Sequence, residues 1–266
     1  MIDGWSYYTT PYTDRPHHPD YRSLRPAGST GVVLGIVGAT MMLLMLVYSL
    51  QKRLRLFGRR TPLRPFLDGH IFLGVIGPLM IIMHTSFKVQ GLVAIAFWAM
   101  IAVALSGYFG RYLYQQIPRT IDDKELSLTE IELSLDNALN EIRVRSGLDE
   151  EVLEDVLAKI ERVYFAESTR VYKLLPILIV RDIIRPWSKH RLRHTLSVSG
   201  HIPPQEVKTL TELGGKRALL KRRLHILGRV QRMFHWWHII HKPLAIIMYV
   251  IMIVHITVAV WTGYAW

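Results

Sequence analysis

Residues 70–84 read HIFLGVIGPLMIIMH and residues 241–255 read HKPLAIIMYVIMIVH, so each apolar stretch carries a histidine at both ends. In both stretches the two histidines are 14 residues apart. In an α-helix, 14 steps of about 100° return to within roughly 40° of the starting direction and rise about 21 Å. Each stretch therefore predicts a helix of membrane length with two histidines on one face, one near each end.

Four stretches are long and apolar enough to cross a bilayer, whose hydrocarbon core is about 30 Å thick and needs roughly 20 helical residues. They cover residues 31–50, 68–85, 92–112 and 239–264. Only six residues, 86–91, separate the second stretch from the third, so these two form a tight antiparallel hairpin. The sequence therefore predicts an all-α membrane protein with four transmembrane helices.

The composition sets apolar spans against a strongly basic remainder. Half of the 266 residues are hydrophobic, yet the chain holds 33 Lys and Arg and a net charge of +12. The basic residues lie beside the spans, so we expect membrane lipid, and no nucleic acid, among the partners. The absence of cysteine excludes disulfides, thiolate zinc sites, cysteine-ligated iron–sulfur clusters and covalently attached haem.

The distribution of basic residues predicts the orientation. The loop at 51–64 holds six Lys and Arg and no acid, whereas the first 30 residues hold three, balanced by three Asp. Because basic loops stay on the inner side, both termini are expected outside. The first 30 residues lack the apolar core of a cleavable signal peptide, so the first span is expected to act as an uncleaved insertion signal. We expect the bacterial inner (cytoplasmic) membrane as the location.

The expected domain organisation has four parts. Residues 1–30 form an outer tail, 31–112 the first three transmembrane helices, 113–237 a small helical cytoplasmic domain inserted between helices 3 and 4, and 238–266 the fourth. Within the inserted domain, Ser127 and Glu130 form a capping box at the start of one amphipathic helix, and Gly147 ends that helix. The apolar segment 173–184 is too short to span, so it packs into the domain or lies on the membrane. A basic helix from about Ala218 leads into the fourth span.

The orientation pairs the four histidines by depth, because the second and fourth spans run in the same direction. His70 and His241 lie near the inner face, and His84 and His255 near the outer face. Imidazole is an axial ligand of haem iron, and cofactors of helical bundles sit between facing helices. The pattern predicts a haem-binding bundle with two haem b groups, one held by His70 and His241 and one by His84 and His255.

Two alternatives stay open at this point. Histidines in lipid can also join helices by hydrogen bonds or relay protons, although ionisable groups there are most often functional. The inner ligand of the fourth span has a runner-up in His238, because HWWHIIH offers three histidines. Only His241 keeps the 14-residue register with His255.

Residues near the four histidines add less specific expectations. Gly74 and Gly77 let a flat macrocycle or another helix approach, and Pro78 is expected to kink its span. Basic residues near the interfaces suit either haem propionates or lipid headgroups: Arg64, Lys88, Arg111, Arg232 and Lys242. Polar residues near the two faces are candidates for a quinone site: Asp68, His238 and Arg232 inside, and Thr85, Ser86 and Lys88 outside.

The doubled spacing of His70/His84 and His241/His255 resembles the two ligand helices of the di-haem cytochrome b superfamily. That superfamily includes the cytochrome b of quinol:cytochrome c oxidoreductases and the cytochrome b subunits of formate dehydrogenases and hydrogenases. Residues 106–119, SGYFGRYLYQQIPR, and 234–255 are also similar to bacterial ferric-reductase-like membrane cytochromes. The resemblance covers the four spans, and it implies b-type haem, electron transfer between membrane faces and often quinone chemistry.

The sequence departs from these families in two ways. It has no Pro-Glu-Trp-Tyr quinol-oxidation motif, and the inserted domain carries no flavin or nicotinamide motif. We therefore expect an electron-transfer subunit of a respiratory-type or photosynthetic oxidoreductase complex rather than a self-sufficient enzyme. Expected partners are quinone or quinol and subunits bearing cytochrome c, iron–sulfur or flavin groups. The alternative is a haem-free membrane transporter or assembly scaffold whose histidines bind metal or protons.

Overall fold

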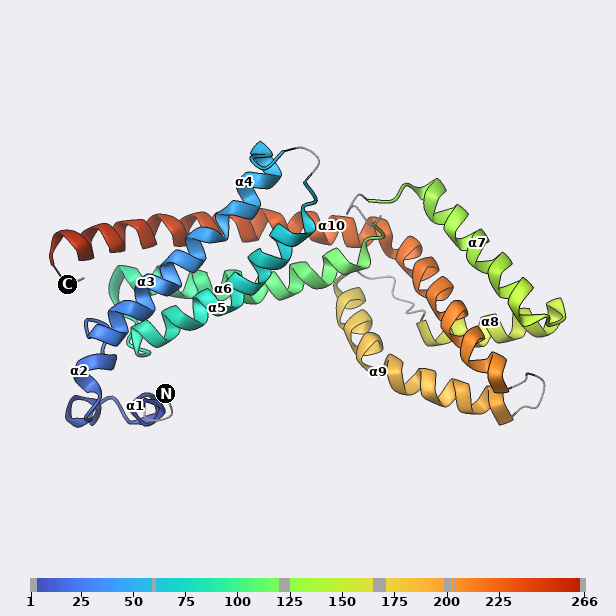
Figure 1. Ribbon diagram of the computed structural model, residues 1–266, viewed down its shortest axis with the longest axis horizontal. Helices are drawn as coiled ribbons and strands as arrows, with labels where there is room; N and C mark the ends of the chain where they lie inside the picture. The colour runs from blue at the N-terminus through green and yellow to red at the C-terminus, as the bar shows by residue number, and fades with distance from the viewer. Residues whose placement is uncertain are drawn as a thin grey trace. The chain divides into compact units, whose positions relative to one another are not determined.

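The computed structural model describes residues 4–58, 61–119, 125–164, 171–198, 202 and 204–263. Regular secondary structure in these ranges is helical, apart from one isolated bridge between Arg119 and Glu125 (Figure 1). The chain divides into two compact units. Unit 1 is Met1–Tyr112 with Phe234–Trp266, and unit 2 is Leu113–Met233. These divisions lie at, or within one helical turn of, the boundaries expected for the inserted domain.

The elements of unit 1 are seven helices and two that continue into unit 2. The short outer elements are α1 (Trp5–Thr9), η1 (Arg15–His17) and α2 (Tyr21–Leu24). The longer ones are α3 (Ser29–Leu44), α4 (Leu46–Leu54), α5 (Arg64–Thr85), α6 (Gly91–Gln116) and α10 (Pro204–Trp261), of which α6 and α10 enter unit 2. Unit 2 adds α7 (Leu128–Ser146), α8 (Glu150–Tyr164) and α9 (Val171–Val198).

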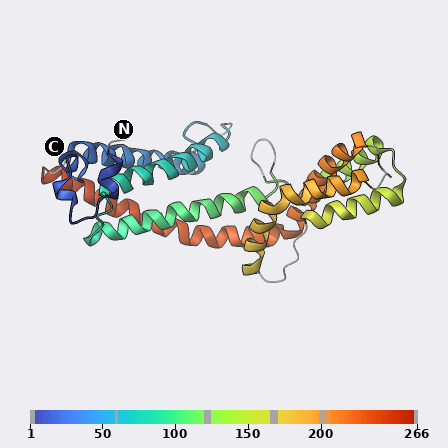
Figure 2. The same ribbon diagram turned by 90° about the horizontal axis from the view of Figure 1, so that it is seen from below.

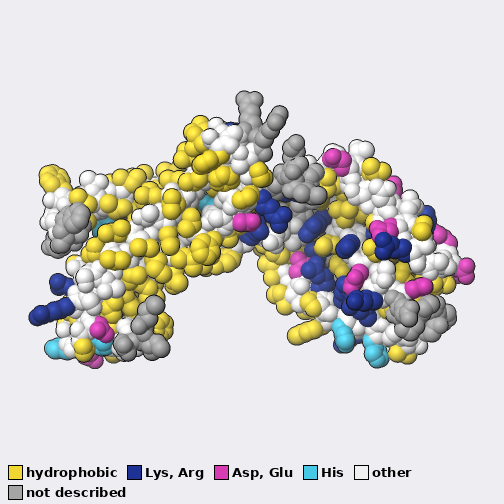
Figure 3. Space-filling view, viewed as in Figure 1, with side chains coloured by type: hydrophobic (Ala, Val, Ile, Leu, Met, Phe, Trp, Pro, Cys, Tyr) yellow, Lys and Arg dark blue, Asp and Glu magenta, His cyan; other side chains and the backbone are white. Residues whose placement is uncertain are grey.

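Four helical segments in the described residues are long and apolar enough to cross a membrane. They are Tyr21–Leu54, Arg64–Thr85, Gly91–Gln116 and Glu206–Trp261, and each contains one expected span apart from Tyr264, which lies outside the described residues. Large apolar side chains cover the surface of unit 1 (Figure 3). A contiguous apolar surface of this extent is compatible with an integral membrane protein.

The first span differs from expectation because it is not one unbroken helix. The helix is interrupted at Met45, which separates α3 from α4. The span expected at 31–50 therefore contains a joint near its inner end. Pro78 lies inside α5, which continues without interruption from Arg64 to Thr85.

Glycines bring α3 and α5 together. A β-carbon on Gly38 would lie 2.8 Å from the Ile81 side chain, and one on Gly77 would lie 3.2 Å from the Met42 side chain. A β-carbon on Gly74 would lie 3.2 Å from the Met45 side chain. Gly74 and Gly77 thus serve the second of the two uses expected for them, the close approach of another helix.

The helices α6 and α10 form a second close pair, seen side by side in Figure 2. The indole Nε1 of Trp237 donates to the carbonyl of Ser106 at 2.8 Å. A β-carbon on Gly110 would collide with the same indole ring. A glycine on α6 and a large aromatic side chain on α10 therefore set how closely these two helices approach.

An apolar core joins the two helix pairs at mid-height. It contains Met42 of α3, Ala99 and Met100 of α6, and Met248 of α10, with Ile81 and Ile82 of α5 packed against it. The Tyr249 hydroxyl donates to the carbonyl of Met42 at 2.6 Å. Met248 is midway in sequence between His241 and His255. The core therefore fills unit 1 between the two levels of histidines.

The outer tail folds against the turn between α5 and α6. Arg15 is buried, and its guanidinium donates to the carbonyls of Thr10, Tyr8 and Ser86. The Ser86 hydroxyl in turn donates to the carbonyl of Leu24 at 2.8 Å. These bonds link residues 62 to 71 positions apart and hold the tail on the end of α5 that carries His84.

Unit 2 is built on an apolar core between α8 and the first half of α10. The buried side chains include Leu153, Leu157 and Ile160 of α8 and Leu210 of α10. A β-carbon on Gly214 would lie 2.7 Å from Ile160, so a glycine is needed where these helices meet. The expected basic helix starts earlier than Ala218, because α10 runs from Pro204.

The local predictions for unit 2 are confirmed at α7. The Ser127 side chain accepts from the Glu130 amide, and the Glu130 carboxylate accepts from the Ser127 amide, which makes the capping box. Gly147 ends α7 with a left-handed backbone, φ 56°. The segment 173–184 lies inside α9 and is not among the candidate spans, as its length predicted.

Candidate functional site

The predicted ligands come from two helices of unit 1. His70 and His84 are on α5, and His241 and His255 are on α10. The imidazole of His241 lies near enough to His70 to interact with it electrostatically, and His255 interacts in the same way with His84. The structure thus brings the four histidines together in the two pairs that the sequence predicts. Their role as ligands of iron stays a prediction.

His84 is fixed by α3. Its Nδ1 lies 2.8 Å from the carbonyl oxygen of Gly31. A carbonyl can only accept, so Nδ1 carries the hydrogen and Nε2 keeps its lone pair for a ligand. A β-carbon on Gly35 would lie 2.8 Å from the same Nδ1, so only glycine leaves room for this ring.

His70 is held in the same manner at the other end of α5. Its Nδ1 lies 3.1 Å from the carbonyl oxygen of Met45, at the joint between α3 and α4. The ring of Tyr48 lies beside it, with 5.3 Å between ring centroids. The carbonyl again fixes the hydrogen on Nδ1 and leaves the Nε2 lone pair available.

His241 is held by α6 through a side chain. Its Nδ1 lies 2.7 Å from the Ser106 hydroxyl oxygen, and that hydroxyl donates to the Val103 carbonyl at 2.9 Å. Because the Ser106 hydrogen is given to Val103, its oxygen accepts from Nδ1. The Trp237 ring, 4.6 Å from the imidazole between centroids, packs against it.

His255 differs from the other three. It is exposed within the chain, and no hydrogen-bond partner for its ring occurs among the described residues. Its placement follows from α10, which keeps it in register with His241. The ring therefore has more freedom to turn than those of His70, His84 and His241.

The runner-up His238 occupies a different environment. Its Nδ1 lies 2.9 Å from the Phe234 carbonyl oxygen of its own helix, and the ring packs between Phe234 and Trp237. It interacts electrostatically with Lys52 and Lys242, whereas His241 does so with His70. The geometry favours His241 as the partner of His70.

Several polar candidates already have partners in the chain. Asp68 forms ion pairs with Arg111 at 3.4 Å and with Arg64 at 4.0 Å. Thr85 and Ser86 are buried, and their hydroxyls donate to backbone carbonyls. The structure therefore ties Asp68, Thr85 and Ser86 into the packing of unit 1, and does not gather them into a quinone pocket.

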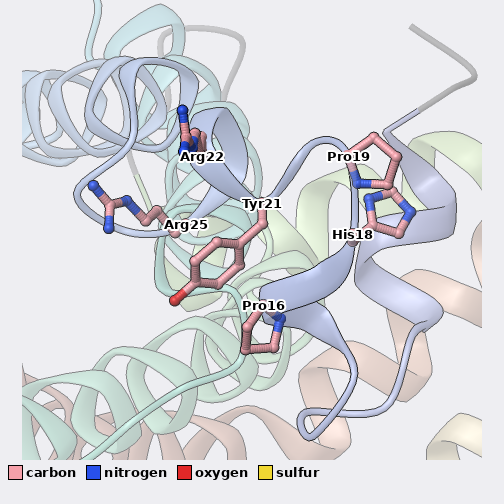
Figure 4. A pocket seen from close by; sticks show the side chains of 6 residues that line it. All are labelled: Pro16, His18, Pro19, Tyr21, Arg22 and Arg25. Carbon is pink, nitrogen blue, oxygen red and sulfur yellow. The ribbon is translucent and has the colours of Figure 1, made fainter.

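One open depression lies in the outer tail (Figure 4). It encloses about 570 Å³, and it is lined by Pro16, His18, Pro19, Tyr21, Arg22 and Arg25. His18 contacts Ser6, with 3.1 Å between Nε2 and the hydroxyl oxygen. None of the four predicted ligands lines this depression.

No three His, Cys, Asp or Glu side chains converge as a metal site within the described ranges. The predicted iron sites are of another kind. Each level supplies two imidazoles from opposite helices, and a porphyrin provides the remaining ligands of its iron. The donor set of each pair therefore fits haem, which needs only axial ligands from protein.

Sequence reasoning missed the residues that hold the predicted ligands. Gly31 and Gly35 follow the four-residue spacing of small residues at helix contacts, and that signal was available on the first span. Ser106 is a hydroxyl in an apolar span, which also marks a hydrogen-bonding role. The Met45 carbonyl had no sequence signal, because any residue supplies one.

Comparisons with family models, with curated proteins and with solved structures find no match to this chain.

Proposed function

We propose that the chain is a membrane cytochrome b that binds two haem b groups and carries electrons across the bilayer. It would act as one subunit of a larger redox complex. The observation that carries the proposal is the pairing of His70 with His241 and of His84 with His255, each pair drawn from the same two helices. One coincident pair has many explanations, whereas two pairs in one register favour two equivalent cofactors.

The hydrogen bonds at Nδ1 support this use of the histidines. Ligating histidines usually donate their second N–H to a carbonyl or another acceptor, which fixes the ring orientation and raises ligand basicity. His70, His84 and His241 each have such an acceptor, at 3.1, 2.8 and 2.7 Å. Their Nε2 atoms are then the ones that would hold iron. Haem b, when bound, supplies an iron that takes up and releases one electron.

The chain's own residues separate the two levels. The levels are about 21 Å apart along the helices, and the core around Met42, Met100 and Met248 lies between them. An apolar core of this kind excludes water and ions. Charge would therefore cross the middle of unit 1 as electrons rather than as a leak of ions.

The proposal requires partners, because electrons must enter at one face and leave at the other. The chain has no cysteine to bind an iron–sulfur cluster or a covalent haem. Quinol, or subunits with cytochrome c, iron–sulfur or flavin groups, would serve as donor and acceptor.

An absorption spectrum with haem quantitation tests the proposal. The full chain, purified from haem-replete cells, is expected to show a reduced b-type spectrum with two haems per chain. His70→Ala and His255→Ala are each expected to lower the haem content by about one. His235→Ala is the matched control, because this exposed histidine of the same helix lies outside both pairs. A colourless wild-type chain would eliminate the proposal in favour of a haem-free membrane protein.

A further inference from the structure

Two facing rows of charged side chains join α9 and α10 in unit 2. Asp182, Arg185, Lys189 and Arg193 follow one another at three- or four-residue spacing, so they share one side of α9. Two ion pairs connect this row to α10. Arg193 pairs with Glu212 at 3.0 Å, and Asp182 pairs with Arg222 at 2.8 Å. Opposite charges therefore meet at both ends of the row.

Between these two ion pairs, like charges meet. Lys189 interacts electrostatically with Lys216 of α10 and with Arg185 on its own helix. Arg185 also interacts with Arg223 of α10. The middle of the row thus places two cations of α9 beside two of α10. Like charges at such positions destabilise a fold unless an anion lies between them.

The nearby acids do not balance these cations. Asp182 already accepts from Arg222, which is only 2% exposed, and it also pairs with Arg185 at 3.6 Å. Glu212 is taken by Arg193. Burial raises the pKa of Tyr164, which lies among these arginines, so its phenol is neutral and adds no negative charge. Lys189, Lys216 and Arg223 have no ion-pair partner in the part of the chain that the structure describes.

Burial makes the uncompensated charge more costly. The pKa of Lys189 is lowered, first by burial and then by the neighbouring Arg193. The Nε atoms of Arg222 and Arg223 are buried without a hydrogen-bond acceptor. Buried donors of this kind are normally satisfied, so an acceptor from outside the chain would complete the site.

We propose that the four cations Arg185, Lys189, Lys216 and Arg223 form a binding site for a phosphate-bearing anion. Phosphate offers several acceptor oxygens and up to two negative charges, which matches guanidinium and ammonium groups on two sides. The site is reachable, because Lys216 is exposed and the other three cations are half-buried. Figure 3 shows Lys and Arg side chains gathered on this unit's surface. The phosphate can belong to a soluble anion or to an anionic lipid headgroup.

Thermal unfolding of the full chain in neutral detergent tests the site and separates the two sources. The first comparison is inorganic phosphate against chloride at matched ionic strength. The second is short-chain phosphatidylglycerol against short-chain phosphatidylcholine. A bound anion is expected to raise Tm by about 2–4 °C. A rise with phosphate assigns a soluble anion, and a rise with phosphatidylglycerol alone assigns a lipid headgroup. No rise above either control would overturn the proposal.

Substitution gives a second test with two opposite effects. Lys189→Gln with Lys216→Gln is expected to raise Tm without anion, because it removes the repulsion, and to abolish the anion-dependent rise. Lys216→Gln alone, at an exposed position, is expected to halve that rise. Arg191→Gln is the control, because it removes an equal charge from a different side of α9. A wild-type anion response in the double variant would contradict the site.

Discussion

The Nδ1 atom of His84 lies 2.8 Å from the carbonyl oxygen of Gly31, so a helix that carries no predicted ligand fixes the ring of one that does. The same helix, α3, ends where the Met45 carbonyl meets His70. One helix therefore orients both histidines of α5. The first span has a specific function in the proposed site, beyond anchoring the chain.

Gly35→Val tests this role of α3 at the outer level. A β-carbon at residue 35 would lie 2.8 Å from His84 Nδ1, so the ring must move. We expect the haem content to fall from about two to about one, with the inner haem retained. Absorbance spectra of the purified variant measure this. Gly107→Ala is the control, because a β-carbon there meets nothing within 4 Å. Full haem content in Gly35→Val would argue against the orientation of His84 described here.

Ser106→Ala tests the corresponding hydrogen bond at the inner level. Its hydroxyl is the acceptor for His241 Nδ1, at 2.7 Å. Loss of such a partner typically weakens the metal site by about 10- to 100-fold. We expect weaker inner-haem binding and a shifted midpoint potential for that haem alone. Redox titration separates the two haems. Ser106→Thr keeps the hydroxyl and is expected to restore the wild-type potential, and failure to do so would make the effect one of packing.

Arg15→Gln tests how the outer tail is held. The guanidinium donates to three carbonyls, including Ser86 next to the end of α5. Hydrogen bonds to a charged donor are worth roughly 1.5–3 kcal/mol each, and a buried carbonyl without a donor is costly. We expect a lower Tm and faster limited proteolysis within residues 4–28. Arg22→Gln, an exposed arginine of the same tail, is the control and should match wild type. Equal protection of both variants would show that Arg15 does not hold the tail.

The sequence predicted the four spans and the histidine pairs because both rest on periodicity. An apolar run of membrane length and a 14-residue spacing on one helix need no knowledge of tertiary structure. The partners of the rings could not be predicted in the same way. The Gly31 and Met45 carbonyls depend on which helix lies beside α5, and many packings satisfy the same hydropathy.

The expectations for single residues near the histidines were less specific. Gly74 and Gly77 were equally compatible with a macrocycle and with a helix, and they pack against α3. The break at Met45 had no proline or glycine to mark it. In unit 2 the capping box of Ser127 and Glu130 was readable because both partners are four positions or fewer apart, so the local sequence contains the whole motif.

That capping box has a defined pH dependence. Hydrogen bonds from Ser127 lower the pKa of Glu130 below its ordinary value of 4.5. A carboxylate with a lowered pKa contributes stability that is complete above the unfolded-state pKa and is lost as the pH falls through the folded-state pKa. We expect amide protection in the first turn of α7 to fall as the pH drops below about 4.5 in wild type. Hydrogen exchange by mass spectrometry measures it.

Ser127→Ala gives the comparison for that measurement. Removing an N-cap hydroxyl costs about 1 kcal/mol of helix stability. The variant is therefore expected to show weak protection of the first turn already at neutral pH, with a smaller further loss in acid. Comparing the two proteins at each pH cancels the intrinsic pH dependence of exchange. Parallel curves for wild type and Ser127→Ala would contradict the role of the box.

The most direct test of the central claim is haem content in double histidine variants, because the claim concerns pairs. His70→Ala with His241→Ala removes both ligands of one predicted pair, whereas His70→Ala with His255→Ala removes one ligand from each. The proposed pairing predicts about one haem per chain in the first variant and none in the second. Equal haem content in the two variants would contradict it.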